Sequence, residues 1–66
     1  MTIQFNVYVS KAFDFLTEGV HYLVTLEGGH GIHQCLHFQN LKTGGGVVLR
    51  SWQVEKAFDS GYLIKE

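Results

Sequence analysis

The chain has 66 residues, of which 45% are hydrophobic and 17% are charged, and its formal net charge at pH 7 is −1. This length allows one domain, and the apolar content excludes a disordered chain. Five Lys and Arg against six Asp and Glu provide neither the basic footprint of a nucleic-acid-binding protein nor the charge density of a DNA mimic.

The distribution of apolar residues and cysteine predicts a cytoplasmic protein. No apolar run exceeds three residues, so no segment is expected to span a bilayer, and the first residues lack the early positive charge of a signal peptide. Cys35 is the only cysteine, which excludes an intramolecular disulfide and fits a reducing compartment. Because apolar burial in so short a chain barely offsets the entropy of ordering it, a metal or a second subunit is expected to add stability.

Apolar residues at every second position predict five short β-strands. These strands follow residues 3–9, 20–26, 32–38, 47–52 and 62–64. Glycine-rich runs at 27–31 and 42–46 separate them, and glycine reaches the positive φ values that hairpin turns need. Strands this short in one small domain predict an all-β meander or a small barrel.

Two segments also fit short helices. Ser10 is a candidate N-cap for residues 11–18 and Ser51 for residues 52–59, and a glycine follows each segment. The second segment overlaps the predicted fourth strand, so Trp52 ends a strand in one interpretation and begins a helix in the other.

The two helical candidates contain a short internal repeat. Residues 9–14 and 54–59 are identical at five of six positions, and each copy ends in Phe-Asp. One interpretation is a local solution used twice, in which the Phe fills the core before a strand restarts. The other is a pseudo-symmetric pair of contact surfaces.

Residues 13–16 leading to 22–26, followed by residues 43–54, resemble the course of an SH3-like barrel. Such barrels have a long first loop before the second strand, a glycine-containing hairpin between the third and fourth, and a 3₁₀ turn before the fifth. The resemblance implies a five-stranded SH3-like barrel or a strongly curved antiparallel sheet with one or two short helical turns. It does not extend to the aromatic residues with which SH3 domains bind proline-rich peptides, so it implies a fold and not a function.

Histidines gather around the single cysteine. On a strand, His33, Cys35 and His37 share one face, with alternate residues about 6.6 Å apart. Imidazole and thiolate groups at this spacing suit zinc, and His21 on the preceding strand or His30 in the loop is the candidate fourth ligand. The alternative is a polar strand face turned toward solvent or another subunit. Catalysis is not expected, because this spacing is awkward for a thiolate–imidazole hydrogen bond and no acid lies nearby to orient the pair.

Four further residues are candidates for binding a protein partner: Tyr8, Arg50, Trp52 and Tyr62. Tyr, Trp and Arg are the residue types enriched at binding hot spots. Tyr8 falls on the polar face of the first strand, and Trp52 as a strand residue shares its face with Arg50 and Val48. The alternative places Trp52 in the core.

These observations predict a non-catalytic protein–protein interaction module that self-associates and regulates or inhibits a larger protein. A compact accessory protein of this kind fits a phage or mobile element. The alternatives are a zinc-binding protein that uses the His and Cys cluster, and a small barrel that stacks single-stranded nucleic acid on its aromatic residues.

Overall fold

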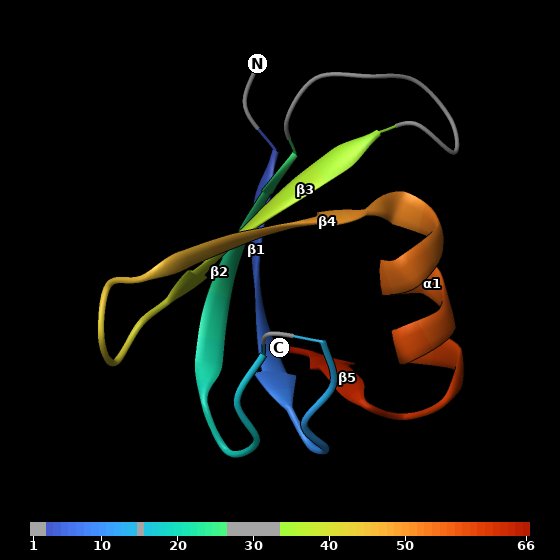
Figure 1. The fold of residues 1–66 in the computed structure, drawn as a ribbon, viewed down its shortest axis with the longest axis horizontal. Coiled ribbons are helices and arrows are strands. Elements are labelled where there is room, and N and C mark those ends of the chain that lie inside the picture. Colours follow the sequence, from blue (N-terminus) through green and yellow to red (C-terminus); the bar gives the residue numbers. More distant parts are fainter. Residues whose placement is uncertain (1–2, 15, 27–33) are drawn as a thin grey trace.

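Five antiparallel strands and one helix make up most of residues 3–14, 16–26 and 34–66, which are the residues that the computed structural model describes (Figure 1). The elements are β1 (Gln4–Val9), β2 (His21–Leu26), β3 (Cys35–Asn40), β4 (Gly46–Arg50), α1 (Ser51–Asp59) and β5 (Leu63–Lys65). The strands form one sheet in the order β4-β3-β2-β1-β5. The prediction of a mainly β fold with a short helix is confirmed.

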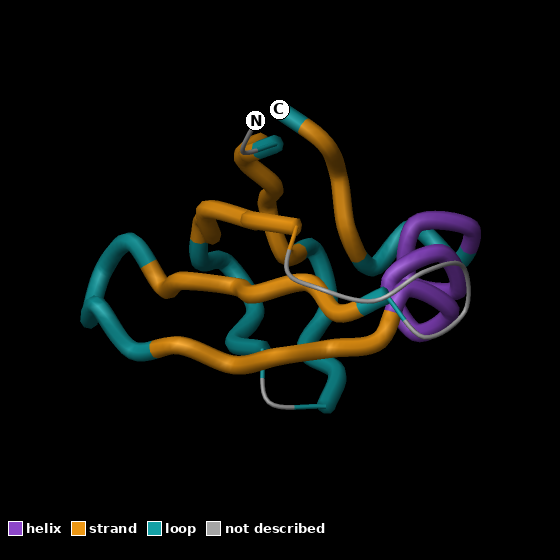
Figure 2. The backbone as a smooth tube through the Cα atoms, turned by 90° about the horizontal axis from the view of Figure 1, so that it is seen from above, coloured by secondary structure: helices purple, strands orange, loops and turns teal. Residues whose placement is uncertain are grey.

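The sheet is twisted and is not closed into a barrel. β4 and β5 lie at its two edges, and within the described residues these edges do not pair. In Figure 1, β4 crosses in front of the steeper β1 and β2, and α1 stands beside the sheet between the ends of β4 and β5. The view from above in Figure 2 shows β3 and β4 running side by side toward α1. A helix of nine residues thus takes the place of the 3₁₀ turn that the SH3-like resemblance implies.

The core lies on the face of the sheet that α1 covers. Phe5, Val24, Phe38 and Val47 stand opposite one another in register and form a row across four strands. Val24 and Phe38 are fully buried, as the period-two pattern predicts. Ile3 departs from the pattern, because it precedes β1 and is 53% exposed.

The first loop joins β1 to β2, and its described residues, 10–14 and 16–20, are not helical. The helix predicted over residues 11–18 is therefore wrong. An isolated bridge joins Phe13 to Leu16, and Asp14 has a φ of 47°. The ends of the loop extend the β1–β2 pairing, because the Val9 N–H donates to the Val20 carbonyl and the Gly19 N–H donates to the Val9 carbonyl. These two bonds close the loop as a continuation of the antiparallel pair.

The buried Tyr22 ties this loop to the end of β3. Its hydroxyl accepts a hydrogen bond from the Thr17 N–H at 2.9 Å and a longer one from the Asn40 side-chain amide at 3.4 Å. The aromatic ring packs edge-on against Phe38, with ring centroids 6.3 Å apart. One side chain therefore joins the first loop, β2 and β3.

Tyr22→Phe is expected to lower the free energy of unfolding by about 1–3 kcal/mol, because the ring stays and the Thr17 N–H loses its acceptor. In a domain of this size each kcal/mol lowers the melting temperature by about 4–8 °C. Thermal unfolding followed by circular dichroism measures this shift. Tyr8→Phe is the control, since Tyr8 lies on the opposite face of the sheet; an equal shift in both variants would contradict the prediction.

The glycine-rich hairpin between β3 and β4 forms as predicted, one residue earlier. The Asn40 side-chain oxygen accepts hydrogen bonds from the N–H groups of Lys42 and Thr43 at 2.8 and 3.1 Å. Gly44 has a φ of 83°, a value that glycine adopts at low cost. Gly46 already belongs to β4.

α1 confirms the helical interpretation of residues 52–59 and contradicts the strand interpretation, since β4 ends at Arg50. Val54 and Ala57 are buried at helical spacing. The N-cap is Arg50 and not Ser51: its backbone N–H donates to the Gln53 side-chain oxygen at 3.0 Å. At the other end, Gly61 has a φ of 78°.

The C-terminus of α1 closes with the paired hydrogen bonds of a Schellman motif. The Gly61 N–H donates to the Phe58 carbonyl at 3.1 Å, and the Tyr62 N–H donates to the Ala57 carbonyl at 2.9 Å. This motif reverses the chain after the helix. It carries Tyr62 back toward the first loop and directs the chain into β5.

Candidate functional site

A groove of about 340 Å³ lies between the first loop and α1. Three aromatic residues, Phe13, Trp52 and Tyr62, line it together with the buried Ala57. Four polar residues complete the lining: Asp14, Gln53, Lys56 and Ser60. We call this the aromatic groove.

One end of the aromatic groove is built by packing of Tyr62 on the first loop. The Phe13 and Tyr62 rings lie 5.9 Å apart and are tilted by 50°. The Lys11 ammonium lies 5.2 Å from the Tyr62 ring centroid, a cation–π distance. Ser10 donates its backbone N–H to the Tyr62 carbonyl at 2.8 Å and its hydroxyl to the Gly61 carbonyl. These contacts hold the two half-buried rings in place.

The other end is built at the first turn of α1. Trp52 is 54% exposed there, and Lys56 stands one turn later on the same side of the helix. The Gln53 side-chain amide donates to an Asp14 carboxylate oxygen at 3.5 Å, while its oxygen accepts from the Arg50 N–H. Gln53 therefore links the start of α1 to the first loop beside Trp52.

No protein-family model, curated protein or solved structure matches this chain. Among the described residues, no helix has the length and apolar character needed to cross a bilayer.

The structure brings together two of the four residues predicted to bind a partner. Trp52 and Tyr62 both line the aromatic groove, and the exposure of Trp52 places it at the surface. Arg50 lies at the junction of β4 and α1, outside the groove. Tyr8 lies on the other face of the sheet, with its ring 5.1 Å from the His21 ring. The expected strand face shared by Trp52, Arg50 and Val48 does not form, because Trp52 is helical.

Sequence reasoning missed Phe13, Asp14 and Lys56 as parts of the site, although the internal repeat contains the signal. Phe13 and Asp14 belong to its first copy, whereas Lys56 and Ala57 belong to its second. Both copies line the same groove. The repeat therefore indicates two segments that face each other across the groove, although one is a loop and the other is a helix.

The proposed metal ligands are only partly in the described residues, because His30 and His33 lie outside them. Cys35 and His37 occupy the face of β3 opposite the buried Leu36 and Phe38, as predicted. The His37 ring covers Gly46: a Cβ atom there would lie 2.5 Å from its Nε2.

His21 does not lie beside His37, so its assignment as the fourth ligand is wrong. Thr25 is the β2 residue opposite His37, which places His21 four residues, or about 13 Å, farther along the strand. Its Nδ1 is 2.5 Å from a carboxylate oxygen of Glu66. Within the described part of the chain, no three His, Cys, Asp or Glu side chains converge on one point.

Proposed function

We propose that this protein is a small non-catalytic interaction module that binds a segment of a larger protein in the aromatic groove. The observation that carries the proposal is the exposed Trp52, which lines one groove with Phe13 and Tyr62. Trp and Tyr dominate the binding energy of many protein interfaces. A concave site with mainly apolar lining and a few polar groups is also the usual form of a ligand site.

The lining favours a particular kind of segment. An apolar side chain fits against the rings of Phe13 and Tyr62 and the Ala57 methyl group. Lys56 in the lining and Lys11 on the Tyr62 ring provide positive charge around it, whereas the Asp14 carboxylate already accepts the Gln53 amide. The favoured ligand is therefore an apolar residue with an acidic neighbour.

The order of the connections supports an SH3-like architecture as the scaffold of this module, with α1 in place of the closing turn. In this arrangement the first loop and the helix that follows β4 form the two walls of the groove. A module of this kind has no chemistry of its own. It acts on its partner as a regulator or inhibitor by occupying a segment of the partner's surface.

Selection of peptides from a random display library against the wild-type protein tests the proposal. Trp52 is the only tryptophan, so its fluorescence reports on ligands in the groove of the wild-type protein and of Leu41→Ala. The fluorescence anisotropy of a labelled peptide compares all variants, including Trp52→Ala, which has no tryptophan. Trp52→Ala is expected to weaken binding of the selected peptides at least tenfold, as expected for a hot-spot residue. Leu41→Ala is the matched control, because Leu41 is equally exposed at 54% and lies outside the groove.

Three results would contradict the proposal: no enriched peptide, selected peptides that bind Trp52→Ala as tightly as wild type, or an equal loss in Leu41→Ala. Circular dichroism of each variant shows that the fold is retained. Selected peptides in which an acidic residue adjoins the apolar one would further support the role of Lys56.

A further inference from the structure

The outer edge of β4 presents backbone groups that no described strand pairs. The Asn40 N–H donates to the Gly45 carbonyl, and the Ser51 N–H donates to the Gln34 carbonyl. These two bonds fix the alternation of the β3–β4 ladder. Because hydrogen-bonded and non-hydrogen-bonded pairs alternate in antiparallel strands, the N–H and C=O groups of Gly46 and Val48 point away from β3.

The two edges of the sheet differ in how they are protected against pairing. β5 has three residues and carries Lys65, and a short, charged strand is a usual protection. β4 has five residues in unbroken register with β3, and its sequence has no charge before Arg50. Val48 stands at its centre and is 58% exposed. β4 is therefore the edge suited to pairing.

We propose that a second copy of this chain pairs with this edge, antiparallel and about a two-fold axis that places Val48 opposite Val48 of the second copy. Both residues then exchange N–H···O=C bonds, because both point these groups outward. The same register places Arg50 opposite Gly46 of the second copy. Arg50, the one charged residue of β4, thus lies opposite a glycine and not opposite Arg50 of the second copy.

The two-fold axis makes this pairing closed, so it gives a dimer and not a fibre. None of the residues that line the aromatic groove belongs to β4. Each dimer therefore carries two open grooves and can bind a partner with two copies of the same segment by avidity. The pairing itself is independent of what the groove binds.

Cross-linking tests the register. In a Cys35→Ser background, Val48→Cys is expected to form a disulfide-linked dimer under mild oxidation, because opposed residues in a hydrogen-bonded pair have Cα atoms about 5.5 Å apart, within disulfide range. Ile64→Cys in the same background is the matched control: Ile64 is 50% exposed on β5. It is expected to cross-link at least tenfold more slowly.

Sedimentation of the uncross-linked proteins provides the second readout. The wild-type protein is expected to approach twice the monomer mass as its concentration rises. Val48→Lys places two like charges opposite each other. It is expected to raise the dissociation constant of the dimer at least tenfold and to leave the circular dichroism spectrum unchanged. Four results would overturn the proposal: a wild-type monomer at millimolar concentration, equal cross-linking rates, a limiting mass above the dimer, or an unchanged dissociation constant in Val48→Lys. The first of these results includes the case in which the protein stays monomeric and β4 pairs with a strand of another protein.

Discussion

Phe38→Ala is expected to lower the free energy of unfolding by about 3–5 kcal/mol, the usual cost of removing a fully buried aromatic side chain. Phe38 is 0% exposed at the centre of β3, opposite Val24 and Val47, and its ring packs edge-on against Tyr22. A chain of this length has a total stability of about 3–10 kcal/mol. The substitution therefore removes a large part of that stability.

Urea unfolding followed by circular dichroism measures the loss. Phe38→Leu keeps most of the volume and is expected to cost less than about 2 kcal/mol, near the range of other hydrophobic exchanges. Leu41→Ala removes an exposed side chain and is expected to stay within about 0.5 kcal/mol of wild type. If Phe38→Ala unfolds at the same urea concentration as Leu41→Ala, the assignment of Phe38 to the centre of the core is wrong.

The strands could be predicted because one face of the sheet is buried and the other is not. Val7, Val9 and Val24 are all fully buried, and the alternation of apolar positions with Gln4, Asn6 and Thr25 fixes the side-chain direction along these strands. The alternation of apolar and polar residues does not identify the segment after β4, because one face of a helix is buried there with a different spacing. Trp52 extends the apolar residues 47–49 in the strand interpretation, whereas Val54 and Ala57 have helical spacing, so the sequence leaves both interpretations open.

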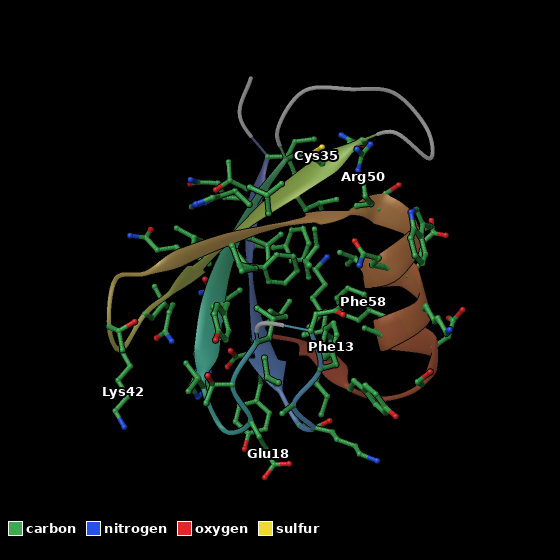
Figure 3. The ribbon with its side chains drawn as sticks, in the orientation of Figure 1. Phe13, Glu18, Cys35, Lys42, Arg50 and Phe58 are labelled. Atoms are coloured by element: carbon green, nitrogen blue, oxygen red, sulfur yellow. The ribbon has the colours of Figure 1, made fainter. Side chains whose placement is uncertain are left out.

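The internal repeat shows how tertiary context overrides local preference. Lys-Ala-Phe-Asp is a loop at residues 11–14 and the last part of α1 at residues 56–59. The first copy must join two neighbouring antiparallel strands, whereas the second bridges opposite edges of the sheet and ends in the Schellman motif. Phe13 and Phe58 nevertheless both pack against the core (Figure 3).

The aromatic groove could be predicted only in part for the same reason. Residue type identified Trp52 and Tyr62, since exposed Trp and Tyr suggest binding. Phe13 became part of the site through its packing on Tyr62, 49 positions away in the sequence, and no local pattern encodes that contact. The expectation for His21 fails for the opposite reason, because the adjacency of two strands does not give the register that separates His21 from His37.

α1 covers one face of the sheet and contributes buried residues to the core, so it is expected to stabilise the fold. The Val54→Asp variant tests this contribution. Val54 is 4% exposed on the buried side of α1. A carboxylate there loses its hydration, so the substitution is expected to lower the free energy of unfolding at pH 7 by several kcal/mol. Burial raises the pKa of the introduced Asp above its unfolded value near 3.9, so the loss is greatest above the raised pKa and shrinks as the pH falls below it.

Unfolding of Val54→Asp is therefore measured at pH 7 and pH 4, beside wild type and Val54→Asn, whose amide does not titrate. Glu55→Ala, at the exposed neighbouring position, is the control and is expected to stay within about 0.5 kcal/mol of wild type. A helix that shares the core loses its signal together with the sheet in one transition, because α1 spans the two edges and buries Val54 and Ala57 against the same cluster as Phe38. Loss of the helical signal with an unchanged sheet transition would mean instead that α1 is an appendage, and the aromatic groove would then lack its fixed wall.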